Sequence, residues 1–582
     1  MVLKKKTVTM CGMKRALSGA IATILACSAI AAIPFTYMHW ATGLALPGVL
    51  PQLEADSLYY LVQMDEVLSG RWLLGNPYFM EYGELRSPAI LLPIWIASLP
   101  GTLGLSINSI FAVNICVYTI LTGLLFYVLL FRATKGNAFL SITLSIVGVA
   151  YVHNLIVRPA IMQTVYPAFL LFLIVLLLYL EKPDSTWRTV GVALTAALGF
   201  YMYLYVWMTA FTMIGLVLLW SLLRRNGPLM RSQIIVWPLT GALCMPQIVL
   251  MMRDRSDPMF TELTYRTGLI STHLIHPLTI FNLKYVILTV TALILLYWKR
   301  TMPKSAVLVL IANTALVIAA TSNLVTGAML DLSTHLWRLS LVIAPLAIAC
   351  FLLIAWKERE RKLWERLVAG CCAILLLATA AQHIVIRANA FPYLRNLDAG
   401  KVTNSKIQQY QPILDFLNSL PAKRQVILTM GYIGAYVPLY TDHTLLFLGT
   451  GRFNPIPTAE LQERFLVQYV DSIDPEFVRK NVRELAGIGP LREQEYTEVC
   501  RTLPFCSADT TAHPIEHIGG NTFVEDMMEL HEKINREYEE RLAKFHVSLI
   551  VVDKESGQSP RIPESATRIY NDDRFSMFQL KG

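Results

Sequence analysis

The chain has 582 residues, of which 54% are hydrophobic and 16% charged, and its mean hydropathy is +0.48. This balance excludes a soluble multidomain protein and is typical of a polytopic membrane protein with one water-exposed part. The formal charge of +9 does not indicate nucleic-acid binding, because Lys and Arg lie in short clusters between apolar runs and no zinc, Walker or dinucleotide motif is present.

The N-terminal segment combines a basic stretch (1–15) with an apolar run (16–38). A cleaved signal peptide is one interpretation. We favour an uncleaved first span, because the run is longer than a usual signal-peptide core and many more spans follow.

Ten further apolar segments predict membrane spans, although several are shorter than the roughly 20 residues that cross a bilayer comfortably. They are 108–131, 137–157, 163–180, 189–204, 206–223, 232–252, 283–298, 304–321, 339–356 and 366–386. One more apolar run, 87–106, is interrupted by Pro88, Pro93, Pro100 and Gly101.

The distribution of basic residues decides whether 87–106 crosses the membrane. If it does not cross, the cytoplasmic pieces hold twenty Lys and Arg residues and the outer loops before residue 387 hold seven. Cytoplasmic loops carry such an excess, and a crossing at 87–106 would invert it. We therefore expect a non-crossing juxtamembrane or re-entrant helix there, eleven spans, a cytoplasmic N-terminus and an outer C-terminus in a multi-pass protein of the plasma (inner) membrane.

The residues after about 390 are charged and mixed in pattern. A helix is predicted over 405–420 and a long one over 521–545. "RQVILTM", "TLLFLG", "VSLIVVDK" and "RFSMFQL" are typical of strands. The predicted fold is thus a polytopic α-helical domain (1–390), whose first outer loop is 39–107, followed by an extracytoplasmic α/β domain (391–582).

Seven of the nine cysteines lie in or beside the predicted spans, where packing is their ordinary role. Cys500 and Cys506 lie in the outer domain. They form either a disulfide, which an oxidising compartment would permit, or two free thiols.

The first outer loop contains "QLEADSLYYL", which places Glu54 and Asp56 beside the membrane. One interpretation is structural: the carboxylates are solvated, or Asp56 caps a short helix. The other is general-base catalysis on a lipid-linked sugar, in which a carboxylate accepts the proton of an acceptor hydroxyl.

Such a reaction also needs cations for the leaving phosphate. The outer face offers five candidates, which are Arg86, Arg158, Arg266, His335 and Arg338. His335 and Arg338 are three residues apart and share one face if their segment is helical.

The order of "LEADSLYYL", "LSGRWLLGNPYFMEYGE" and "SPAILLPIWIASLPG" resembles that of the GT-C superfamily of membrane glycosyltransferases. This superfamily includes protein O-mannosyltransferases, aminoarabinose transferases and oligosaccharyltransferases. "VTGAMLDLSTHLWR" is also similar to a segment of uncharacterised bacterial relatives. The resemblance covers residues 1–390 in layout, but only short motifs match.

The resemblance implies transfer of a sugar from a polyprenyl-phosphate-linked donor to a glycan, lipid or protein acceptor, with inversion. It implies that Asp56 is the base, with Glu54 as the weaker candidate, because Asp56 precedes the aromatic pair Tyr59 and Tyr60. These tyrosines then belong to the substrate-binding residues.

Two departures limit this resemblance. No WWDYG motif is present, which argues against transfer to Asn, and the second outer loop (153–167) has no acidic residue. A divalent cation such as Mg or Mn is therefore doubtful, and we expect no cofactor.

Other polar motifs have weaker arguments behind them. His273 and His276 resemble ordinary loop histidines more than a ligand pair, and "YMYLYVWM" (201–208) suits an aromatic belt better than a sugar platform. Glu81, Glu84 and Asp331 are further acids with no spacing argument.

Two rival functions remain open. A transporter or lipid flippase usually places ionisable groups within its spans, whereas here they gather at the outer ends. A non-catalytic envelope scaffold would use mainly the outer domain. The sugar, the acceptor and the lipid length have no signal in the sequence.

Overall fold

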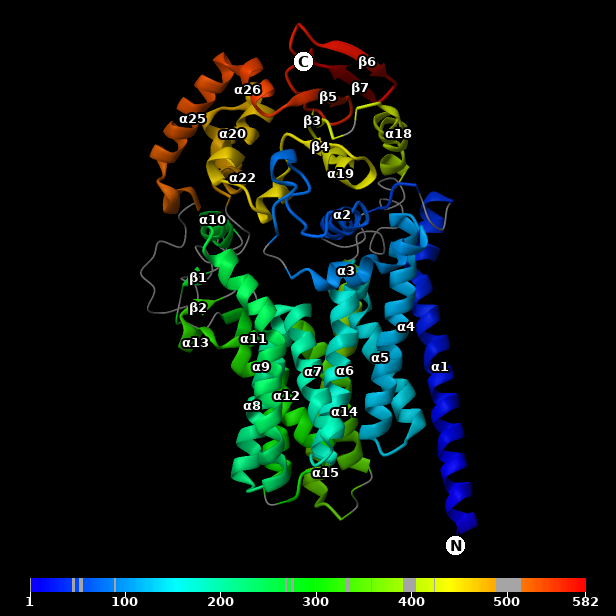
Figure 1. Ribbon diagram of the computed structural model, residues 1–582. Helices are drawn as coiled ribbons and strands as arrows, with labels where there is room; N and C mark the ends of the chain where they lie inside the picture. The colour runs from blue at the N-terminus through cyan, green and yellow to red at the C-terminus, as the bar shows by residue number, and fades with distance from the viewer. Residues whose placement is uncertain are drawn as a thin grey trace.

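The computed structural model has two layers, a bundle of long helices and a mixed α/β layer at one end of it (Figure 1). It describes residues 2–43, 48–51, 56–87, 90–266, 270–271, 273, 277–298, 300–329, 335–356, 358, 360–390, 405–422, 424–487 and 514–581. Buried apolar side chains form a core that runs from the bundle into the second layer.

Each of the eleven predicted spans corresponds to one helix of the bundle. These helices are α1 (Val2–Thr42), α4 (Ile107–Ala133), α5 (Ala138–Ile156), α6 (Ile161–Glu181), α7 (Thr186–Met202), α8 (Leu204–Leu223), α9 (Gly227–Arg255), α11 (Pro277–Tyr297), α12 (Lys304–Ala320), α14 (Trp337–Trp356) and α15 (Leu363–Ala390). Side chains at the helix starts satisfy orphan backbone donors: Asn137 accepts from the Leu140 amide, and Asn226 accepts from the Leu229 amide.

Nine helices among the described residues are long and apolar enough to cross a membrane. The two others are α7, which has 17 residues, and α11, whose apolar part is Leu283–Tyr297. Both fall short of the roughly 20 residues of a standard span. The multi-pass fold is confirmed, and the number of crossings stays a prediction.

The run at 87–106 forms only short helices in the structure, α3 (Leu92–Ser98) and the 3₁₀ turn η2 (Leu99–Leu103). Together they span 12 residues, which is too short to cross a bilayer. α3 contacts α2 (Ser57–Leu68) and lies at the end of the bundle that faces the second layer (Figure 1). The predicted non-crossing helix is therefore confirmed.

The second layer contains a five-stranded sheet with the strand order β4-β3-β5-β7-β6. Its strands are β3 (Val426–Thr429), β4 (Thr444–Leu445), β5 (Val547–Asp553), β6 (Thr567–Asn571) and β7 (Phe575–Gln579). β4, β3 and β5 are parallel, and β7 pairs antiparallel with both β5 and β6. The four predicted strands are confirmed, whereas β6 was not predicted.

Helices and turns surround this sheet. They include α18 (Gln411–Ser419), α19 (Val437–Tyr440), η5 (Gly449–Phe453), α20 (Thr458–Gln468), α21 (Pro475–Lys480), α22 (Val482–Ala486), α25 (Asn521–Arg536) and α26 (Tyr538–Lys544). The predicted helix over 521–545 is broken at Glu537 into α25 and α26.

The first outer loop packs into this second layer. The Leu445 amide donates to the Tyr78 carbonyl (2.8 Å), and the Leu50 amide donates to the Tyr440 hydroxyl (2.8 Å). Glu81 forms an ion pair with the buried Arg464 (2.7 Å). Loop and outer domain therefore form one layer over the ends of the helices.

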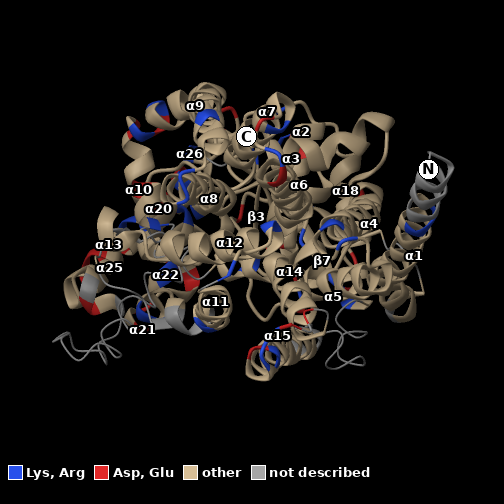
Figure 2. Ribbon diagram, turned by 90° about the horizontal axis from the view of Figure 1, so that it is seen from below, with Lys and Arg blue, Asp and Glu red and all other residues tan. Residues whose placement is uncertain are grey.

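The N-terminus lies at the end of the bundle that is remote from this layer (Figure 1). Seen from that end, most of the bundle ribbon is uncharged, as its tan colour shows (Figure 2). The connections at this end include the ion pairs Arg132–Glu181 (2.5 Å) and Arg300–Glu365 (3.0 Å).

Candidate functional site

Asp56 stands immediately before α2 but does not cap it. Its backbone is left-handed (φ 68°), whereas a capping residue usually has an extended backbone, and its side chain makes no cap hydrogen bond. Its Oδ2 instead accepts a hydrogen bond from Arg158 Nη2 at 2.7 Å. The structural interpretation of Asp56 as a helix cap therefore fails.

Arg158 lies in the four-residue connection between α5 and α6, which packs under the first turn of α2. Its Nη2 also donates to the Tyr60 hydroxyl (2.9 Å), and its guanidinium lies 4.8 Å from the centre of the Tyr60 ring. Tyr60 follows Asp56 by one helical turn, so both side chains reach the same cation. The Arg158 side chain is 10% exposed and that of Asp56 is 54% exposed. The carboxylate thus faces open space while its partner is buried.

Two non-glycine residues with positive φ flank this ion pair, Asp56 and Ala160 (φ 58°). The Ala160 amide donates to Gln163 Oε1 (3.0 Å), which holds the short connection in place. Strained backbone of this kind costs about 1–3 kcal/mol per residue, and it clusters at functional sites.

His335 and Arg338 lie at the start of α14 and belong to the same cationic region. Burial, then the charge of Arg338 and that of Arg158, lowers the pKa of His335 to about 3. His335 is therefore neutral at neutral pH, and its Nδ1 lies 3.3 Å from the Tyr205 hydroxyl.

The Arg338 Nε atom is buried and has no hydrogen-bond partner in the described part of the chain. Buried polar groups are normally paired, so such a group requires an explanation. An anion that binds beside Asp56 would provide the missing acceptor, and hydrogen bonds from a guanidinium to phosphate are strong.

Tyr59 does not face Arg158. Its ring packs edge-on against Tyr60 (5.2 Å) and Phe453 (6.5 Å), and burial raises the pKa of its hydroxyl. It therefore joins α2 to the outer layer instead of entering the ion-pair group.

The structure places Arg266 in the outer layer, fully buried at the end of α10 (Pro258–Arg266). It donates to the Arg452 carbonyl (3.0 Å), the Thr458 hydroxyl (3.0 Å) and the Asn454 carbonyl (3.3 Å). These bonds occupy its guanidinium, so the structure does not bring Arg266 to the Asp56 group.

Arg86 lies apart from the group in a separate cavity of about 700 Å³. It forms an ion pair with Asp254 (3.0 Å) at the end of α9. Trp95 and Tyr201 also line this cavity, so part of the "YMYLYVWM" segment borders it.

Several other predicted residues lie elsewhere or outside the described residues. Glu84 lies 3.5 Å from Arg424, and His273 Nδ1 lies 3.1 Å from the Leu324 carbonyl. Residues outside the described part are Glu54, His276, Asp331, Cys500 and Cys506. Among the residues that the structure does describe, no group of three or more His, Cys, Asp or Glu side chains could hold a metal ion.

Tyr205 is the residue of the group that sequence reasoning did not assign. It lies in the aromatic run 201–208, at the first turn of α8, and its ring contacts His335 (5.9 Å) and Tyr203 (4.7 Å). The run itself was the only available signal, because its partner lies 130 residues away in the chain.

Comparison with known proteins yields solved structures but no sequence relatives. No family model matches the sequence, and no curated protein matches it. The chain is similar to ArnT from Cupriavidus metallidurans bound to undecaprenyl phosphate, with 13% identity, a TM-score of 0.47, and coverage of 96% of this chain and 97% of that one. The apo state of ArnT from the same organism gives 12% identity, a TM-score of 0.40, and coverage of 94% and 97%. At these levels the likeness assigns neither a substrate nor residue roles to this chain.

Proposed function

We propose that this chain is a membrane glycosyltransferase that moves a sugar from a polyprenyl-phosphate-linked donor to an extracytoplasmic acceptor. The observation that carries the proposal is the Asp56 group: a half-exposed carboxylate on a buried arginine, beside a second arginine whose buried Nε has no partner among the described residues. This group lies where apolar helices end, and that is the level at which a lipid-linked donor presents its sugar-phosphate.

In the proposed reaction the acceptor hydroxyl oxygen attacks the anomeric carbon of the donor sugar. The new glycosidic bond forms as the bond between that carbon and the phosphate oxygen breaks, and the hydroxyl proton passes to Asp56. Attack from the face opposite the phosphate inverts the anomeric configuration. A positioned general base typically contributes about 100- to 10,000-fold to the rate.

The cations of the group act on the leaving phosphate. Arg338 donates to the phosphate oxygens, and Arg158 adds positive charge while it orients Asp56. Neutral His335 contributes a hydrogen-bonding imidazole without a charge of its own. A transporter would not need a strained carboxylate of this kind at the membrane surface.

The test is a transfer assay on the purified full-length protein with a panel of radiolabelled polyprenyl-phosphate sugars. Asp56→Asn keeps the size of the side chain and an acceptor for Arg158, so the variant should fold and bind donor, but its turnover should fall at least 100-fold. Asp65→Asn, on the same helix, is the matched control and should retain transfer. Full turnover by Asp56→Asn in an active preparation would refute the assignment.

A further inference from the structure

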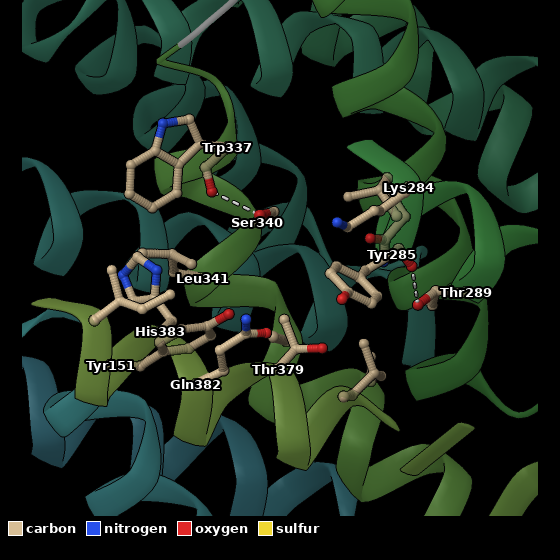
Figure 3. Close-up of a pocket in the computed structure, with 16 residues that line it drawn as sticks. Tyr151, Lys284, Tyr285, Thr289, Trp337, Ser340, Leu341, Thr379, Gln382 and His383 are labelled. Carbon is tan, nitrogen blue, oxygen red and sulfur yellow. Dashed lines mark hydrogen bonds between the residues drawn. The ribbon is translucent and has the colours of Figure 1, made fainter. Parts of the chain in front are cut away.

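A second polar group lies inside the helical bundle, around a cavity of about 290 Å³. α5, α11, α12, α14 and α15 contribute its walls. Lys284 and Tyr285 face Trp337 and His383 across it, and Gln382 lies between them (Figure 3). Ionisable groups within apolar helices are rare and indicate a functional site by default.

The cavity lies near the ends of the helices that face the outer layer. Lys284 is the second residue of the apolar segment Leu283–Tyr297, and His383 is four positions from the end of the apolar segment Leu363–Ile386. At 1.5 Å per residue, both lie within about 6 Å of the boundary of these segments, which is the level of lipid headgroups.

The opening of the cavity faces sideways. Lys284 on α11 is exposed at the surface of the bundle, as are Gln382 and Ile386 on α15. In a membrane this surface is in contact with lipid, so an amphipathic molecule can enter between α11 and α15 without leaving the bilayer.

The chemistry of the walls selects for a negative charge. Lys284 lies over the Tyr285 ring (5.1 Å), and His383 lies between the rings of Tyr151 (4.8 Å) and Trp337 (5.2 Å). The other polar lining groups are hydroxyls and amides, and none of the lining residues, all of which are described, is Asp or Glu. A cation with neutral donors and no carboxylate suits a phosphate, and the aromatic and aliphatic walls suit acyl chains.

We propose that this cavity binds the phosphate-bearing headgroup of a membrane lipid, which enters between α11 and α15. The proposed site is distinct from the Asp56 group, although the two adjoin in the sequence: Trp337 lines the cavity and the next residue is Arg338. The inference does not depend on glycosyl transfer, because it concerns binding alone.

The test measures binding of fluorescent phosphatidic acid to the full-length protein in detergent, by anisotropy. Lys284→Gln removes the cation and Ala344→Trp fills the cavity, so each should weaken binding at least tenfold. Lys304→Gln, at the opposite end of the bundle, is the matched control and should bind like the wild type. Diacylglycerol, which lacks the phosphate, should bind at least tenfold more weakly.

Further arms separate this site from other sources of binding. Arg338→Ala should retain the component of binding that Lys284→Gln removes, and loss of that component would place the probe at the Asp56 group. Competition by inorganic phosphate at the concentration of the lipid would mean that the site takes a soluble anion. Unchanged binding in Lys284→Gln, or equal binding of diacylglycerol, would also overturn the proposal. Asp56→Asn should bind the probe normally, so a failure here differs from a failure of the proposed transfer reaction.

Discussion

Arg338 and Arg266 show how differently two arginines of the same outer region are used. Arg266 has three acceptors in the outer layer, whereas the buried Nε of Arg338 has none among the described residues. A buried donor without a partner costs about 1–3 kcal/mol, so a protein retains it only for a purpose other than stability. Arg338 therefore fits a ligand-binding role and Arg266 fits a structural one.

Arg338→Met is expected to weaken donor binding at least tenfold without lowering the melting temperature, because Met matches the length of the side chain and removes an unpaired donor. Donor titration and thermal unfolding of the purified variant would measure both. A large drop in melting temperature with unchanged donor affinity would show that Arg338 is a structural residue.

Asp65, on α2, supplies a pH dependence at the same scale. Burial, and then the charge of Glu66, raises its pKa from 3.8 to about 7. Between about pH 4 and pH 7 the folded chain therefore binds the proton more tightly than the unfolded chain. This contribution to the free energy of unfolding is complete below pH 4 and is lost as the pH rises through 7.

Asp65→Asn should remove this loss, because an amide does not ionise. The melting temperature of the wild type should fall between pH 5 and pH 8 relative to that of Asp65→Asn, while Asp184→Asn, at an exposed site, should follow the wild type. Parallel curves for all three proteins would contradict the assignment.

At the scale of elements, α10 and α2 attach the outer layer to the bundle. α10 follows α9 after only two residues, and its last residue, Arg266, binds the segment between η5 and α20. Gly487, after α22, lies against the Arg266 side chain, where a Cβ would come within 2.7 Å of it. The contact thus requires a glycine whose φ is also positive (64°).

Arg266→Met should destabilise the outer layer by about 2 kcal/mol or more, since it removes three hydrogen bonds from a buried cation and leaves two carbonyls without that donor. Limited proteolysis of the detergent-solubilised protein should cut the outer domain faster in this variant. Arg338→Met serves as its matched control, and equal cleavage of the two variants would refute the structural role.

At the scale of the whole molecule, the N-terminus and the outer layer lie at opposite ends of the bundle (Figure 1). This arrangement requires an odd number of crossings, as the distribution of Lys and Arg also does. The side of the membrane on which the outer layer lies follows from the charge pattern alone.

Alkaline phosphatase fusions would test this orientation. Fusions at residues 135 and 228, in the basic connections, should be inactive, and a fusion at residue 400 should be active. An active fusion at 228 would invert the topology and place Asp56 on the cytoplasmic side.

Much of the fold follows from local patterns. The bundle helices coincide with apolar runs because a segment in lipid must satisfy its backbone internally and carry apolar side chains along its length. Strands β3, β4, β5 and β7 are apolar for the same local reason. β6 escaped prediction because "TRIYN" is an edge strand whose side chains are half-buried or exposed, so it has no apolar alternation.

The candidate site depended on tertiary structure. Charge and position in the sequence made Arg86, Arg158, Arg266 and Arg338 equivalent, since all lie in outer segments. Arg158 is 102 residues from Asp56, and only the packing of α2 on the α5–α6 connection brings the two together. The same packing assigns Arg266 to the outer layer and Arg86 to Asp254. Hydropathy is a property of short segments, whereas a pairing of two distant charges depends on how whole helices are arranged.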